Sequence, residues 1–196
     1  MVILFTEDGY QYLIPLIIYN NLMDDLDGIL AGKLNLRSDF GTRMDNVCDS
    51  ISHTIIIMVI SVEFGLACIL AGLVAVAAVQ VRSISRLDPT VVKGTGSPTN
   101  ELIRHCLFAL LIASMFDFDP TYIIIGVFLV NTITMFVPHP MPYMIRSMTK
   151  STIAVLAVNV ALAVAWLVPY SVVPLAAAFI STYLYSIVHI LVKRTS

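Results

Sequence analysis

Four aspartates in two neighbouring stretches carry the clearest chemistry in this sequence. Asp24 and Asp27 are three residues apart. Asp45 and Asp49 are four residues apart. Either spacing places two side chains on the same face of a helix. Carboxylate oxygens are preferred ligands of hard divalent cations such as Mg²⁺ and Mn²⁺. Four carboxylates can hold one ion or a pair, and a pair of ions stabilises both oxygens of a phosphoryl displacement.

Two glycines accompany the aspartates. Gly28 directly follows the first pair, and Gly41 precedes the second pair by one helical turn. Glycine lowers helix stability, but it lets a flat ring or a phosphate come close to the backbone. A plainer interpretation is that the aspartates cap frayed helix ends at a wet interface. This suits Asp25 and Asp39, but it does not explain four regularly spaced carboxylates with interleaved glycines.

The composition predicts the kind of protein that must position these groups. The chain has 196 residues, of which 58% are hydrophobic and 12% charged, and its mean hydropathy is +0.89. A soluble domain has about 25% charged residues, so a water-soluble globule and a disordered chain are both excluded. The net charge of −2 argues against a nucleic-acid partner. Cys48, Cys68 and Cys106 form no disulfide framework, and we expect three buried, inert thiols.

Seven apolar segments predict an all-α membrane helix bundle that forms one domain over residues 1–196. A membrane-spanning helix needs about 20 mostly apolar residues. The short connection between the first two segments makes these helices antiparallel neighbours, with both aspartate pairs at the same depth. Asn131 and Asn159 lie within later segments, where we expect hydrogen bonds between helices. The segments are approximately 9–31, 41–62, 64–86, 101–117, 120–138, 150–168 and 171–192.

The distribution of basic residues predicts the orientation. If successive connections alternate between the two sides of the membrane, every lysine and arginine falls on one side. The positive-inside rule makes that side cytoplasmic. We therefore expect the C-terminus and the aspartates at the cytoplasmic face of a cell (inner) membrane. Residues 1–9 lack the features of a signal peptide and look like the end of another span, which predicts a missing helix before Met1.

The aspartates and glycines resemble the signature of the CDP-alcohol phosphatidyltransferase family. That signature reads D-x2-D-G-x2-A-R, then eight or nine residues, then G-x3-D-x3-D. The stretch 24–49 matches seven of its eight fixed positions at the family's spacing. The exception is Gly32, which stands where the family has an arginine beside its phosphate-binding region, and which is followed by Lys33. Lys33 projects about 100° around the helix from position 32, so it is a poor substitute.

The resemblance implies a membrane enzyme that moves a phosphatidyl group from CDP-diacylglycerol to a small alcohol, with release of CMP. It implies Mg²⁺ or Mn²⁺ as cofactor, as two ions, and a homodimer. Asp49 would complete the metal site and act as the general base. The other implied metal ligands are Asp24, Asp27 and Asp45, and the implied lining of the CDP pocket is Gly28, Ala31 and Gly41.

The acceptor alcohol is less clearly encoded. Residues 38–41 and the loop 94–99 resemble the phosphatidylserine synthase branch, which favours serine. The four-residue spacing of Arg82 and Arg86 departs from that branch, as does His53 after Ser52. The alternatives, inositol phosphate and glycerol phosphate, need a cationic pocket. The candidate contacts for an acceptor or its phosphate are Lys33, Arg82, Arg86, Lys93 and Arg104, whose plainer role is anchoring at the cytoplasmic face.

Two functions of other classes are compatible with the same residues. Intramembrane carboxylates mark ion pathways in cation transporters, but there they are spread along a route, whereas here they gather at one edge. A catalytically inactive relative that acts as an interaction protein is favoured by Gly32 and the missing first helix. Asp49 separates the alternatives, because only a transferase requires its carboxylate. His53, one turn after Asp49, fits either a partner of that carboxylate or a buried core histidine.

Overall fold

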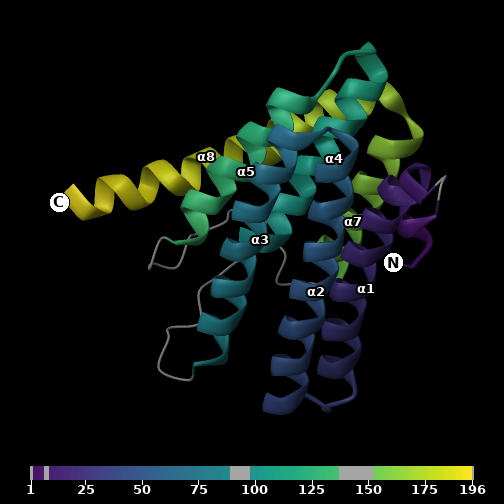
Figure 1. Ribbon diagram of the computed structural model, residues 1–196. Helices are drawn as coiled ribbons and strands as arrows, with labels where there is room; N and C mark the ends of the chain where they lie inside the picture. The colour runs from purple at the N-terminus through teal and green to yellow at the C-terminus, as the bar shows by residue number, and fades with distance from the viewer. Residues whose placement is uncertain (1, 7–8, 89–97, 137–151, 196) are drawn as a thin grey trace.

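The computed structural model describes residues 2–6, 9–88, 98–136 and 152–195, and these are helical, with no strand among them (Figure 1). The seven apolar segments correspond to seven α-helices, which confirms the all-α prediction. The short 3-10 helices are Val2–Phe5, Gly9–Tyr12 and Pro169–Ser171. The α-helices are α1 Leu13–Lys33, α2 Asp39–Glu63, α3 Leu66–Leu87, α4 Pro98–Phe116, α5 Thr121–Met135, α7 Thr152–Leu167 and α8 Val172–Thr195.

The helices are apolar enough for a membrane. Within the described residues, four stretches are long and apolar enough to cross one: Asp39–Glu63, Leu66–Leu87, Pro98–Phe116 and Pro169–His189. Two shorter apolar helices are Thr121–Met135 and Val155–Leu167. α1 has comparable length but carries three aspartates in its C-terminal half. The total number of spans and the side of the C-terminus remain predictions.

A tight turn joins α1 to α2 and makes them antiparallel (Figure 1). Asn35 adopts a left-handed conformation (φ 54°), and the backbone N–H of Leu36 donates to Ala31 O at 3.0 Å. This pattern ends a helix by satisfying its last carbonyls. Ser38 then begins α2, because its Oγ accepts a hydrogen bond from Gly41 N at 3.0 Å. The two aspartate pairs therefore lie on neighbouring helices, as predicted.

α4 is the central helix, and 15 of its 19 residues are buried. It packs against α1, α2, α5 and α8, with Leu102, Leu107 and Phe108 almost wholly enclosed. α8 contacts α4 and extends beyond the other helices towards the C-terminus (Figure 1). Because α4 has little free surface, its polar side chains must find partners inside the bundle.

α2 and α3 approach each other closely. Gly65, at φ 83°, occupies the left-handed region between the two helices, where glycine is the favoured residue. Gly72 of α3 lies directly against Ser61 of α2, and a Cβ atom built on Gly72 would overlap the Ser61 hydroxyl. A small residue at this contact allows the backbones to approach.

The cysteine prediction is partly wrong. Cys68 and Cys106 are buried, but Cys48 is exposed. Cys48 lies beside an apolar stretch in sequence, yet its side chain is on a side of α2 that the neighbouring helices leave uncovered. Local hydrophobicity thus predicted membrane character without predicting which face of the helix is packed.

Candidate metal centre

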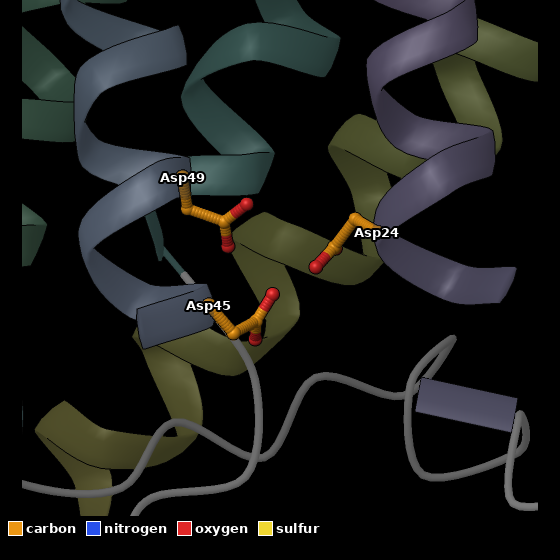
Figure 2. A group of neighbouring side chains, drawn as sticks. All are labelled: Asp24, Asp45 and Asp49. Carbon is orange, nitrogen blue, oxygen red and sulfur yellow. The ribbon is translucent and has the colours of Figure 1, made fainter. Parts of the chain in front are cut away.

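Three carboxylates converge between α1 and α2 (Figure 2). Asp24 projects from α1, while Asp45 and Asp49 project from successive turns of α2. Each offers one oxygen, and these three oxygens lie within 4.8 Å of one another. At 1.5 Å per residue, Asp45 and Asp49 lie about 9 Å and about 15 Å along α2 from its first residue. This three-aspartate site therefore lies about two to three turns of α2 away from the tip of the helix pair, and it is partly open, since Asp45 is exposed.

The donor chemistry of the three-aspartate site fits a hard divalent cation. Three ionised carboxylates at this separation repel one another unless a cation neutralises them or they take up protons. Oxygen ligands from carboxylates suit Mg²⁺ and Mn²⁺. Asp24, Asp45 and Asp49 would hold the ion. Whether one ion or two bind remains a prediction.

Asp27 stands apart from the other predicted metal ligands. It lies one turn nearer the end of α1 than Asp24, its side chain is exposed, and its oxygens are not part of the three-oxygen group. The sequence spacing placed it on the same face as Asp24, and one further turn of helix separates it from the centre of the group. Its role as a ligand stays a prediction.

Asn100 is a site residue that the sequence analysis missed. Its Nδ2 donates to Asp24 Oδ2 at 2.8 Å, and its side chain is buried at the start of α4. The contact joins residues 76 positions apart. It satisfies one lone pair of the carboxylate and restricts its rotation. The only local signal in the sequence was a polar residue at the head of an apolar segment.

A buried polar network joins α4 to α1 near the three-aspartate site. Arg104 forms an ion pair with Glu101 on the same helix at 2.8 Å. Its Nε and Nη2 both donate to Asn21 Oδ1, at 3.0 and 2.8 Å. Arg104 is buried, and these contacts direct its guanidinium to α1 within the protein. Its role as a contact for the acceptor or its phosphate stays a prediction, while its hydrogen bonds to Asn21 join α4 to α1.

The capping interpretation is wrong for Asp25. Its Oδ2 accepts a hydrogen bond from Asn159 Nδ2 of α7 at 2.7 Å, and a longer one from Asn21 Nδ2 at 3.4 Å. Asn21 Nδ2 also donates to Asn159 Oδ1 at 2.8 Å. Asp25 therefore joins α1 to α7, away from either helix end. The prediction that Asn159 and Asn131 bond between helices is confirmed, since Asn131 Nδ2 contacts His105 Nδ1 at 3.2 Å.

Two of the predicted cationic contacts reach the site from α3. Arg82 and Arg86 line a narrow cleft together with Asp49 and with Thr99 of α4. Its free volume is about 10 Å³, close to that of one water site. Asn46 also lines it and bonds to Ser83 O and Oγ at 3.0 and 2.9 Å, which fixes α3 beside α2. Basic side chains of α3 thus lie beside the carboxylates.

The residues predicted to line a CDP pocket surround the end of α1. Apart from its chain neighbours and the backbone of its own helix, no heavy atom of the described residues lies within 4 Å of a Cβ built on Gly28, so this side of α1 is open there. Gly41 has a structural role as well, because its N–H meets the Ser38 cap. Ala31 accepts the turn hydrogen bond, and Lys33 is exposed as the last residue of α1. Lys93 and most of the loop 94–99 lie outside the described residues.

His53 fits neither of its two predicted roles completely. It is buried on α2, one turn beyond Asp49. Its Nδ1 has no hydrogen-bond partner among the described residues. It is thus a core histidine whose ring is not fully satisfied.

A second cavity lies away from the three-aspartate site. It has a volume of about 330 Å³ and is lined mainly by apolar side chains of α4, α5 and α8, with His105 and Asn131 among them. His105 lies about 140° around α4 from Asn100 at 100° per residue. The cavity therefore occupies a different face of α4 from the one that contacts Asp24.

Comparison with known proteins agrees with the geometry of the site. A family model described as CDP-alcohol phosphatidyltransferase matches residues 1–192, almost the whole chain. No curated protein and no solved structure matches the chain.

Proposed function

The chain belongs to the CDP-alcohol phosphatidyltransferase family, and from this premise we propose that it transfers a phosphatidyl group from CDP-diacylglycerol to a small polar alcohol. The family consists of transferases of substituted phosphate groups, which act on a CDP-alcohol and an acceptor. The observation that carries the proposal is the convergence of Asp24, Asp45 and Asp49 at the signature of the family. The acid groups come together at one place, whereas a cation pathway would need them along a route.

In the proposed reaction Asp49 is the general base. It takes the proton of the acceptor hydroxyl, and the acceptor oxygen attacks the phosphorus that bears the lipid. A new P–O bond forms, the P–O bond to the cytidine nucleotide breaks, and CMP leaves with the bonding electron pair. Asp24, Asp45 and Asp49 would hold the divalent cation, and Asn100 orients Asp24. When bound, the cation neutralises phosphoryl charge and makes the hydroxyl more acidic.

The remaining residues of the site would position the two substrates and offset their charge. Holding the acceptor and the phosphoryl group in line reduces the entropy lost at the transition state. The open backbone at Gly28 offers room for the nucleotide, with Ala31 and Gly41 nearby on the α1–α2 hairpin. Arg82 and Arg86 would offset negative charge near Asp49, from a cleft that they share with it.

We propose serine as the acceptor, on the basis of the sequence around Gly41. Inositol phosphate and glycerol phosphate are the competing acceptors, since both carry a phosphate that Arg82 and Arg86 suit. The proposed location is a cell membrane, with the site at its cytoplasmic face and the chain as a homodimer. The apolar helices agree with a membrane protein.

The experiment is CMP release from CDP-diacylglycerol in membranes that contain the protein, with Mn²⁺ or Mg²⁺. Serine, inositol, inositol phosphate and glycerol phosphate are offered separately. We expect acceptor-dependent CMP that disappears with EDTA. Asp49→Asn should lower the rate by roughly 10²–10⁴-fold, the contribution of a general base. Asp119→Asn, which changes an exposed carboxylate before α5, should keep the wild-type rate. CMP release that survives Asp49→Asn would contradict the proposal, as would none with any acceptor.

A further inference from the structure

Position 32 is where this chain departs from the family signature, and another arginine lies over it. A Cβ built on Gly32 would lie 3.0 Å from Arg37 Nη2, and 3.4 Å from both Cζ and Nε. The guanidinium of Arg37 therefore occupies the space beside the glycine. A side chain at position 32 would require the Arg37 guanidinium to move by a few tenths of an ångström, so the glycine leaves this guanidinium its present place.

The turn after α1 brings Arg37 to this place. Asn35 is left-handed, and Leu36 N bonds back to Ala31 O. These two features reverse the chain, so the next residue runs back along the last turns of α1. Arg37 Nη2 reaches Gly28 O, with a long hydrogen bond of 3.4 Å.

This location is close to the metal ligands. Gly28 follows Asp24 by one helical turn, a rise of about 6 Å on the same face of α1. Because the guanidinium lies between Gly28 O and Gly32, it is one to two helical turns, roughly 6–12 Å along α1, from Asp24. Arg37 is exposed, and a guanidinium has five N–H donors. The long contact with Gly28 O involves one of its nitrogens.

We propose that Arg37 binds the phosphate groups of the CDP-alcohol and takes the place of the signature arginine that Gly32 lacks. The inference rests on the proposed function. A planar guanidinium binds two phosphate oxygens at once, which a lysine ammonium does not. A divalent cation held by the aspartates would offset the charge of a diphosphate from one side, and the guanidinium of Arg37 would offset it from the other. Gly32 leaves room for the guanidinium, which reaches this place from the turn after α1.

A purely structural role for Arg37 makes a different prediction. A basic side chain at a helix C-terminus stabilises its last carbonyls and its dipole. In that case removal of Arg37 would lower the unfolding temperature, and CDP affinity would change no more than on removal of any nearby exposed arginine. Arg43, exposed in the first turns of α2, serves as this reference.

The test is isothermal titration calorimetry, in which CDP is added to the purified full-length protein in the presence of Mg²⁺. We expect Arg37→Ala to weaken CDP binding about tenfold or more, and Arg43→Ala to change it by less than twofold. The double variant Gly32→Arg with Arg37→Ala places a guanidinium at the signature position and should recover most of the affinity for CDP. A structural cap would not be restored in this way.

Binding and turnover together separate this inference from the proposed function. If Arg37→Ala binds CDP like the wild type, if Arg43→Ala loses as much, or if the wild-type protein fails to bind CDP, the inference is wrong. Wild-type release of CMP is measured apart from these titrations. If the wild type releases CMP but Arg37→Ala binds CDP normally, the transferase proposal stands and the inference about Arg37 fails. If Arg37→Ala alone loses CDP binding but the wild type releases no CMP, the inference stands and the transferase proposal fails.

Discussion

Replacement of Asn100 by alanine tests how far the bundle orients the three-aspartate site. The change removes the amide that donates to Asp24 Oδ2 at 2.8 Å from α4. Asp24 then keeps its position on α1 but loses the contact that restricts its carboxylate. We expect weaker binding of Mn²⁺ or Mg²⁺, because the free carboxylate must be ordered again each time the ion binds.

The magnitude follows from the kind of contact. A hydrogen bond to a charged group contributes about 1.5–3 kcal/mol, and about 1.4 kcal/mol corresponds to a tenfold change in a binding constant. Removal of a residue that orients a metal ligand typically lowers affinity by about 10–100-fold. Asn100→Ala should therefore raise the half-saturating Mn²⁺ concentration within this range, with a smaller effect on the rate at saturating metal.

The assay measures CMP release and the metal-induced rise in unfolding temperature, both across a Mn²⁺ titration. Asn131→Ala is the matched control, because it removes another buried amide with a contact between helices, to His105 at 3.2 Å. Equal half-saturation for Asn100→Ala and the wild type would refute the orienting role. An equal shift in Asn131→Ala would assign the effect to general loosening of the bundle.

Three further predictions concern packing, charge and metal. Gly72→Ala should destabilise the protein by roughly 1–3 kcal/mol through overlap with Ser61, and Ser61→Ala should recover part of the loss in thermal unfolding. Glu101→Ala should destabilise it by about 3–5 kcal/mol, since Arg104 is left buried without its counter-charge; a variant with leucine at both positions should unfold at a higher temperature than the single variant. Mn²⁺ should raise the unfolding temperature of the wild type by linkage, and an equal rise in Asp45→Asn would count against the metal centre.

The sequence by itself determined the helices and the pairing of the aspartates. Helical hydrogen bonds are local, and a membrane requires every backbone group to be satisfied within its own segment, so apolar length predicted the seven helices. The period of 3.6 residues placed Asp45 and Asp49 on one face of α2. A five-residue connection then made α1 and α2 neighbours. These features depend on residues close together in the chain.

Only the tertiary structure decided which polar groups meet across helices. Asn100 reaches Asp24 over 76 positions, and Asn159 reaches Asp25 over 134. These contacts depend on how α4 and α7 rotate and tilt when they pack. Helix rotation is set by the fit of many side chains together, and no local spacing encodes it. Local spacing therefore suggests a capping role for Asp25, whereas the packing of α7 gives it a hydrogen bond from Asn159.

The same division applies at the signature itself. Its spacing predicted four metal-binding carboxylates, and the packing of α1 against α2 brings the oxygens of Asp24, Asp45 and Asp49 within 4.8 Å of one another, a group that does not include Asp27. The sequence has glycine at position 32, where the signature has arginine, and the backbone reversal at Asn35 places the guanidinium of Arg37 beside that glycine. A sequence motif records only positions along the chain. The binding of a phosphate depends on where charged groups lie in space, and the fold determines this.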